Sequence, residues 1–245
     1  MPSSQPRRAA GARPMPRRDT PWRRLRYRTL SRLPGQTGLD YARKLRKLDA
    51  PQARAAFAAA LEGAKGGICV DLGANLGEFT IQMAAHAGRV HAFEPDPWTA
   101  QQLRARVSDL DGVEVIEAAA GAEDGTVQLY RSPDFARDPD LASQSASILA
   151  EKRNIDPASA VEVRQIDFPR WLEALDADVA VIKIDIEGAE VALLERLFDA
   201  PVLARVGHIF VETHESRIPE LAARTAALRT RAAAMTRPVV NMDWK

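Results

Sequence analysis

The stretch that decides the fold of this chain is Val70-Asp71-Leu72-Gly73-Ala74-Asn75-Leu76-Gly77. An apolar segment, residues 68–70, runs into an acidic residue and a glycine-punctuated turn, and an amphipathic segment follows over residues 78–87. A buried strand, a Gly-rich turn and a helix in this order place backbone N–H groups against a nucleotide-like ligand in α/β proteins. The stretch therefore predicts a nucleoside-binding α/β fold.

The turn departs from the dinucleotide fingerprint G-x-G-x-x-G. Asp71 occupies the first position of that pattern, and the glycines are Gly73 and Gly77. A carboxylate repels a pyrophosphate and attracts an ammonium group. We therefore expect an amino-acid-bearing nucleoside such as S-adenosylmethionine, and a dehydrogenase is disfavoured.

A second acidic residue supports a nucleoside ligand. Residues 89–93 predict the next strand, and Glu94 follows it 23 residues after Asp71. In doubly wound folds an acidic side chain at this position accepts hydrogen bonds from ribose hydroxyls. The turn and Glu94 together predict a nucleoside pocket.

Strands and helices alternate regularly along the rest of the chain. The expected strands are 68–70, 89–93, 113–116, 126–130, 161–166, 179–184 and 206–211. The expected helices are 53–60, 78–87, 98–107, 168–174, 189–198 and 219–234. This alternation predicts an α/β fold with a mostly parallel sheet and helices on both faces.

The composition fits one domain with an appendage. The chain has 245 residues, of which 46% are hydrophobic, and its single cysteine, Cys69, lies in the first strand and excludes an intramolecular disulfide. We expect Cys69 to be a small buried hydrophobic residue. No apolar run is long enough to span a membrane, and no secretory signal is present. We expect a cytoplasmic protein.

Charge divides the chain into two parts. Residues 1–50 contain 14 Lys/Arg and 3 Asp/Glu, whereas the remainder contains 20 Lys/Arg and 30 Asp/Glu. We predict a basic, partly disordered or helical extension over residues 1–50, with basic amphipathic helices at 22–30 and 39–48, and a catalytic domain over residues 51–245. Binding of nucleic acid or an anionic surface by this extension is an alternative, but we favour a solvated segment.

Polar residues gather at the predicted carboxyl ends of the strands, where open α/β sheets bind ligands. The residues at these ends are Asp71, Glu94, Ala120, Asp167, Asp185, Glu187, Glu212 and His214, of which all but Ala120 are polar or charged. Together they predict one cleft.

Residues 183–190, Lys-Ile-Asp-Ile-Glu-Gly-Ala-Glu, form the second informative stretch. Lys183 lies in an apolar run, where an unpaired ammonium is costly, so a carboxylate partner is expected. Asp185 is the candidate, because it lies on the same face of the strand. This pair forms either a polar platform beside the transferred methyl group or a buried structural ion pair.

His214 is the best-placed general base, because imidazole titrates near neutral pH. The surrounding Glu and Asp residues could also hold a divalent metal, but we rank metal binding below direct base catalysis.

These landmarks together resemble the FkbM family of S-adenosylmethionine-dependent methyltransferases. The resemblance spans residues 66–215, with serines at 143, 145 and 147 as a weaker match. Its motifs are residues 71–77, Phe93-Glu94-Pro95, Ala119-Ala120-Gly121, residues 183–190 and Val211-Glu212-Thr213-His214.

The resemblance implies a Rossmann-like class I methyltransferase fold and, usually, O-methylation of a hydroxyl on a small molecule or sugar. It implies a cofactor site of Asp71, Gly73, Asn75, Gly77, Glu94, Ala120 and Asp185. It also implies that Asp185, Glu187, Glu212 and His214 face the acceptor, which is a small molecule or a glycan. Because residues 237–245 provide only one strand, we expect the final antiparallel strand of this fold to be absent, replaced or supplied by a partner chain.

Two other functions stay open. A nucleic-acid methyltransferase is supported only by the Arg-rich segment, because the acidic remainder of the chain repels phosphate. A non-catalytic cofactor-binding scaffold is the second. The sequence identifies neither the acceptor nor the oligomeric state.

Overall fold

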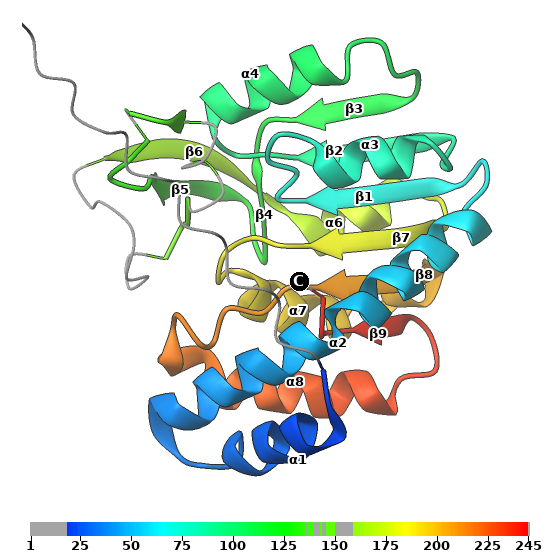
Figure 1. Cartoon of the computed structure of the whole chain (residues 1–245). Helices are drawn as coiled ribbons and strands as arrows, with labels where there is room; N and C mark the ends of the chain where they lie inside the picture. The colour runs from blue at the N-terminus through cyan, green and yellow to red at the C-terminus, as the bar shows by residue number, and fades with distance from the viewer. Residues whose placement is uncertain (1–18, 136, 140–142, 144–145, 150–158, 245) are drawn as a thin grey trace, which may run out of the picture.

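A six-stranded sheet forms the centre of the molecule, and each strand runs parallel to its neighbours (Figure 1). This computed structural model describes residues 19–135, 137–139, 143, 146–149 and 159–244. In spatial order the strands are β3 (Val113–Ile116), β2 (Arg89–Phe93), β1 (Ile68–Leu72), β7 (Val179–Ile184), β8 (Val206–Val211) and β9 (Val239–Asn241). Strand order reverses at β1, and this reversal is where doubly wound folds bind ligands.

The two central strands carry side chains into both layers of the core. In β1, Val70 and Leu72 belong to one hydrophobic cluster, whereas Cys69 belongs to the cluster on the opposite face. In β7, Ile182 lies in the first cluster and Val181 in the second. Burial raises the pKa of the Cys69 thiol to about 12, as expected of an inert buried cysteine.

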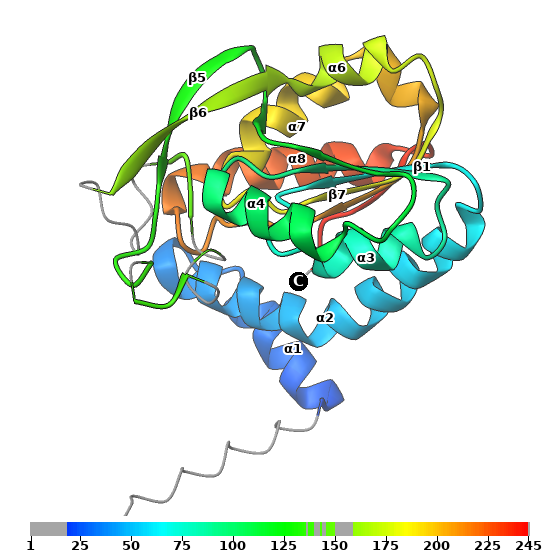
Figure 2. The ribbon, with the colours of Figure 1, turned by 90° about the horizontal axis from the view of Figure 1, so that it is seen from above.

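Helices cover both faces of this sheet (Figure 2). One face carries α6 (Phe168–Ala174), α7 (Glu190–Phe198) and α8 (Ala222–Ala234). The other carries α2 (Gly35–Gly63), α3 (Glu78–Ala84) and α4 (Pro97–Arg106). Two short 3₁₀ helices, η2 (Pro201–Arg205) and η3 (Pro219–Leu221), precede β8 and α8. The predicted α/β architecture is confirmed.

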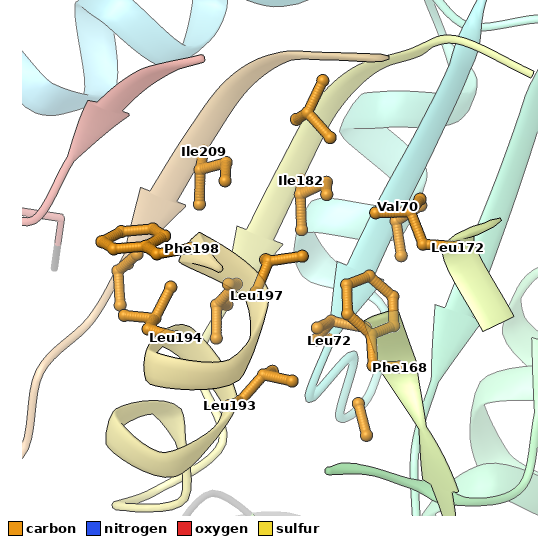
Figure 3. Packing of buried hydrophobic residues seen from close by; sticks show 14 of the residues in the cluster. Val70, Leu72, Phe168, Leu172, Ile182, Leu193, Leu194, Leu197, Phe198 and Ile209 are labelled. Carbon is orange, nitrogen blue, oxygen red and sulfur yellow. The ribbon is translucent and has the colours of Figure 1, made fainter. Parts of the chain in front are cut away.

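The larger cluster packs α7 onto the sheet (Figure 3). Leu193, Leu194 and Leu197 recur on one side of α7 and are fully buried. They share the cluster with Val70 of β1 and Ile182 of β7. This apolar stripe anchors the helix whose first residue, Glu190, is the last residue of the acidic segment 185–190.

A second, three-stranded sheet lies beside the first, in the order β4 (Ala119–Gly121), β6 (Ala160–Asp167) and β5 (Gly125–Tyr130). β4 pairs with β6 in parallel, and β5 pairs with β6 antiparallel. Tyr130 at the end of β5 exchanges backbone hydrogen bonds of 2.8 and 3.0 Å with Ser147. The small sheet thereby holds the described part of the segment 143–149.

The C-terminal segment supplies one strand, as expected, but its direction differs from that of the antiparallel pair in a complete class I sheet. β9 joins β8 in parallel and forms the edge of the large sheet. Trp244, which is buried, packs against Phe57 of α2 and Phe79 of α3 at ring-centroid distances of 4.7 and 5.0 Å. These contacts hold the chain end across the α2–α3 face.

The N-terminal helices differ from the prediction. α1 (Pro21–Leu30) lies close to the expected 22–30, but the helices expected at 39–48 and 53–60 are one continuous helix, α2. Pro51 removes one backbone hydrogen bond within α2, but Ala53, Phe57 and Leu61 are buried and hold the helix in place beyond it.

The expected boundary at residue 50 therefore falls inside a helix, and the division into an extension and a domain stays a prediction. Within the described ranges, no helix is both long and apolar enough to cross a membrane.

Candidate functional site

A cavity of about 450 Å³ opens at the carboxyl ends of β1, β2 and β7. Seven of the predicted site residues line it: Gly73, Asn75, Glu94, Ala120, Asp185, Glu187 and Glu212. Asp71, Gly77 and His214 lie outside its lining. The cavity therefore brings together Glu94, Asp185, Glu187 and Glu212 from the predicted set of polar strand-end residues. Asp167, also expected in this cleft, instead caps the N-terminus of α6.

The turn after β1 takes its shape from left-handed backbone at three positions. Gly73, Asn75 and Gly77 have φ angles of 76°, 50° and 88°. The N–H groups of Gly73 and Ala74 both donate to the carbonyl of Phe93. A Cβ atom on Gly73 would lie 1.9 Å from the carbonyl oxygen of Asp185, so only glycine lets the turn approach the end of β7.

Glu94 closes the turn from the end of β2. Its carboxylate accepts hydrogen bonds of 2.9 Å from the N–H groups of Asn75 and Asp96. Burial raises the pKa of Glu94 to about 7, although both N–H groups favour the charged form. Each carboxylate oxygen can accept a further hydrogen bond, which is the property that a ribose ligand requires.

Asp71 has a different position from the predicted one. Its carboxylate is fully buried, accepts a 2.7 Å hydrogen bond from the Thr80 hydroxyl and lies 3.1 Å from Lys183 Nζ. Lys183 also donates to the carbonyl of Gly73 at 2.8 Å. Asp71 therefore supports the turn from behind and is not part of the cavity lining.

The same contacts correct the expected partner of Lys183. Asp71 and Lys183 are aligned in the register of neighbouring strands β1 and β7, whereas Asp185 follows the last residue of β7. Although burial lowers the pKa of Lys183, the carboxylates of Asp71 and Asp185 raise it above its ordinary value. Lys183 is therefore charged, and its ion-pair partner is Asp71.

His214 lies at the centre of a cluster of carboxylates on the far wall. Its Nε2 atom is 3.2 Å from Glu187 Oε2 and 3.8 Å from both Asp185 Oδ1 and Glu212 Oε1. Its Nδ1 atom is 3.1 Å from Glu190 Oε1. The ring is 2% exposed and is not part of the cavity lining.

The electrostatics of this cluster argue against the predicted role of His214. Burial lowers its pKa, but Glu190, Glu187 and Asp185 raise it more strongly, to about 9. An imidazole that is already protonated at neutral pH cannot accept a proton. The expectation that His214 is the general base is therefore not supported.

Asp185 and Glu187 reach the cavity from the segment between β7 and α7. Burial raises the pKa of Asp185, and Glu212 adds to this effect against the lowering effect of Lys183. Glu187 has a φ of 54°, which is uncommon for a residue with a side chain, and Arg217 Nη1 donates to its carboxylate at 2.9 Å. Strained backbone of this kind recurs at ligand sites.

The sequence did not predict Phe79, Arg217 or Glu190 as site residues. Phe79 and Arg217 line the wall together with Lys183, and Glu190, which is fully buried behind the wall, orients His214. One feature of the sequence could have identified Glu190: it is a charged residue at the start of an otherwise apolar helical stripe. The positions of Phe79 and Arg217 depend on the tertiary fold and had no local signal.

Two serines contact the two walls of the cavity, the Gly-rich turn and the acidic segment after β7. The Asn75 side-chain amide donates to the Ser143 hydroxyl at 3.1 Å, and the Ser147 hydroxyl donates to the carbonyl of Glu187 at 2.7 Å. Both serines line the cavity, whereas the serine at 145 lies outside the described residues. The segment that carries the serines therefore contacts both the Gly-rich turn and the acidic segment.

The fold and the cavity define the class of the protein. A strand order that reverses at β1, a Gly-rich turn after β1 and a carboxylate after β2 make this a Rossmann-like, class I methyltransferase fold. Residues 71–233 match the family model of the methyltransferase FkbM domain, and the chain belongs to this family. Membership of a methyltransferase family implies the use of S-adenosylmethionine.

Solved structures of methyltransferases are similar to this chain. A methyltransferase FkbM from Methylobacillus flagellatus KT is 19% identical over 66% of this chain and 36% of that chain, with a TM-score of 0.38. The 23S rRNA methyltransferase ErmE is 20% identical over 63% of this chain and 43% of its own, with a TM-score of 0.33. An rRNA methylase from Streptococcus thermophilus matches 25% of this chain and 37% of its own at 23% identity and a TM-score of 0.24.

This chain therefore spans less than half of the length of each of these three proteins. No curated protein sequence matches it.

Proposed function

We propose that this protein transfers a methyl group from S-adenosylmethionine to a hydroxyl oxygen of a small molecule or a sugar. One observation carries the proposal: a single cavity is lined both by the Gly-rich turn with Glu94 and by the carboxylates of Asp185, Glu187 and Glu212. When bound, S-adenosylmethionine supplies an electrophilic methyl group on a positively charged sulfur. The cavity thus combines a nucleoside site with groups that can accept a proton.

The residues of the turn side fit the cofactor. A volume of about 450 Å³ lies in the range of small-molecule cofactor sites. Glu94 would hold the ribose hydroxyls, and Gly73 and Asn75 would bring the backbone close to the ligand. The small side chains of residues 118–120 line the cavity at the position proposed for the adenine.

On the opposite wall, Asp185 takes the role of proton acceptor that the sequence had given to His214. Its side chain is 27% exposed and lines the cavity, so an acceptor hydroxyl can reach it. Burial raises its pKa, which makes its carboxylate more basic than an ordinary aspartate. The hydroxyl proton would move to the Asp185 carboxylate as the oxygen is methylated.

The alternatives have less support. A nucleic-acid acceptor would bring phosphates to a wall that carries Asp185, Glu187 and Glu212. A scaffold without catalysis needs neither the raised pKa of Asp185 nor its access to the cavity. Both alternatives are outcomes of the following tests.

Cofactor binding is tested by calorimetric titration with S-adenosylhomocysteine. Wild-type protein and Glu162→Gln, which alters an exposed acid on β6, should bind equally. Glu94→Gln should bind about tenfold or more weakly, because it loses a charge-assisted acceptor for the ribose. A folded wild-type protein that does not bind would contradict the methyltransferase assignment.

Methyl transfer is tested by the release of S-adenosylhomocysteine in the presence of phenols, monosaccharides and single-stranded RNA. Turnover with phenols or sugars that falls about 10²-fold or more in Asp185→Asn supports the proposal. Turnover with RNA alone would favour the nucleic-acid alternative. Cofactor binding without turnover on any acceptor would favour the scaffold.

A further inference from the structure

The cluster around His214 contains a buried nitrogen atom with no hydrogen-bond partner. His214 Nε2 and Asp185 Oδ1 are both inaccessible to solvent and make no hydrogen bond within the described part of the chain. They lie 3.8 Å apart, and Glu187 Oε2 lies 3.2 Å from the same nitrogen. Buried polar atoms without partners are costly, so this arrangement calls for an additional group.

On the other side of the imidazole ring, Nδ1 is in contact with a buried carboxylate. Glu190 Oε1 lies 3.1 Å from His214 Nδ1 and accepts the backbone N–H of His214 at 3.0 Å. Glu190 Oε2 accepts the N–H of Gly188 at 2.7 Å. A carboxylate held in this way orients the ring, with Nδ1–H donating to Glu190. A metal ion that displaces the proton on Nε2 would then meet an Nε2 atom directed at Asp185 and Glu187. Metal-binding histidines are positioned by the same kind of contact.

The spacing of the ligand atoms fits one cation. One atom each from Asp185, Glu187 and His214 lies within 4.8 Å of the others. Two ligand atoms at right angles around a small divalent cation, each about 2.1 Å from it, lie about 3.0 Å apart. The distances of 3.2 and 3.8 Å from His214 Nε2 to the carboxylates are close to this value, so small side-chain movements would complete the coordination.

Charge also favours a cation at this position. Four carboxylates, from Asp185, Glu187, Glu190 and Glu212, lie within 3.8 Å of the imidazole nitrogens. Among the described residues, Lys183 pairs with Asp71, and Arg217 pairs with Glu187. A dication at this position would be attracted by all four carboxylates.

We propose that Asp185, Glu187 and His214 bind a divalent cation of the Mn²⁺ type at the wall of the cavity. Carboxylate oxygens suit Mn²⁺, and the single imidazole nitrogen distinguishes this site from the all-oxygen sites typical of Mg²⁺ and Ca²⁺. Glu212 lies beside this site, and Glu190 supports it from behind. This inference concerns metal binding and goes beyond the proposed methyl transfer.

The test is a titration of Mn²⁺ into protein that has been treated with a chelator, at about pH 8, because protons compete for His214 Nε2. Free Mn²⁺ is followed by its electron paramagnetic resonance signal, which is lost on binding. Wild-type protein should bind one ion per chain. Asp185→Asn and Glu187→Gln should each weaken binding by about tenfold or more.

Glu78→Gln is the matched control, because Glu78 is an acidic residue that lines the same cavity outside the cluster. It should bind Mn²⁺ as the wild type does. Circular dichroism identifies variants that fail to fold. Asp185→Asn preserves the shape of a partly exposed side chain, so it keeps the test informative if Glu187→Gln unfolds.

The outcomes separate this inference from the proposed function. Absence of saturable Mn²⁺ binding in wild-type protein that binds S-adenosylhomocysteine overturns the metal site alone. Equal Mn²⁺ affinity in wild type and Asp185→Asn also overturns it. Mn²⁺ binding by protein that does not bind S-adenosylhomocysteine supports the metal site and contradicts the methyltransferase function.

Discussion

Asp71 and Lys183 form a buried ion pair across the two central strands, with Asp71 Oδ1 3.1 Å from Lys183 Nζ. Both residues are almost completely inaccessible to solvent, and Lys183 also donates to the carbonyl of Gly73 in the turn. The pair therefore connects the stability of the sheet to the shape of the cofactor turn. Lys183 also lines the cavity, whereas Asp71 is not part of its lining.

Removal of one partner of this pair should destabilise the protein strongly. Lys183→Met leaves Asp71 buried without its ion-pair partner, and we expect a loss of about 3–5 kcal/mol in the free energy of unfolding. The measurement is equilibrium unfolding in urea. Arg205→Met is the control, because it breaks an ion pair with the exposed Asp176 and should cost less than about 1 kcal/mol. Similar urea midpoints for the two variants would contradict this account.

Gly73→Ala should abolish cofactor binding. A Cβ atom at this position would lie 1.9 Å from the carbonyl oxygen of Asp185, and the φ angle of 76° disfavours any residue with a side chain. The turn must then move away from β7. Calorimetric titration with S-adenosylhomocysteine and a thermal melt measure the effect. Gly125→Ala, at a site with no atom within 4 Å of the added Cβ, should bind normally and change stability by less than about 0.5 kcal/mol.

Glu94 should make cofactor binding dependent on pH. Its pKa is raised to about 7, and the ionised carboxylate is the stronger acceptor for ribose hydroxyls. Affinity for S-adenosylhomocysteine should therefore rise as the pH increases through about 7, and protons should be released on binding. Titrations in buffers of different ionisation enthalpy measure this release. The pH dependence around 7 should be lost in Glu94→Gln. If the variant keeps this dependence, a group other than Glu94 causes it.

The same pKa predicts how Glu94 affects folding stability. The unfolded carboxyl loses its proton near pH 4.5, whereas the folded one keeps it until about pH 7. The contribution of Glu94 to stability is therefore full below about pH 4.5 and falls as the pH rises to 7, by about 3 kcal/mol in all. Urea unfolding of wild type and Glu94→Gln at several pH values gives this difference. If the difference in unfolding free energy between the two proteins does not change with pH, this prediction is wrong.

Leu194→Ala should create a cavity in the larger hydrophobic cluster. Leu194 is fully buried beneath α7, and truncation of such a leucine costs about 2–5 kcal/mol. Leu25→Ala is the matched control, because Leu25 is 55% exposed on α1 and should cost less than about 1 kcal/mol. Urea unfolding compares the two, and equal losses would show that α7 is not held by this packing.

Much of the fold could be predicted from local pattern. The strands at residues 89–93, 113–116, 179–184 and 206–211 and the helix at 168–174 have the predicted limits. Short apolar runs between turn residues and charged residues define these elements without tertiary information. The prediction failed where packing overrides a local signal, as at Pro51 inside α2, whose following residues are held against the core.

Six residues predicted for the site lie together because their positions follow from strand ends, and their roles stay predictions. Gly73, Asn75, Glu94, Asp185, Glu187 and Glu212 all line the cavity, because the carboxyl ends of parallel strands meet at one edge of the sheet. The sequence did not predict correctly which charged side chains form ion pairs with one another. Asp185 was expected to pair with Lys183 from spacing along one strand, but the aligned neighbour on β1 is Asp71.

The sequence by itself determined the class of fold, the family and the edge of the sheet that carries the site, because these follow from apolar periodicity and from short motifs at strand ends. Only the tertiary structure decided which charges meet. Asp71 reaches Lys183 through the register of β1 and β7, and Glu190 reaches His214 because α7 packs back onto the sheet. Electrostatic energy depends on distance and burial, and the same contacts raise the pKa of His214 and direct its Nε2 atom at Asp185 and Glu187.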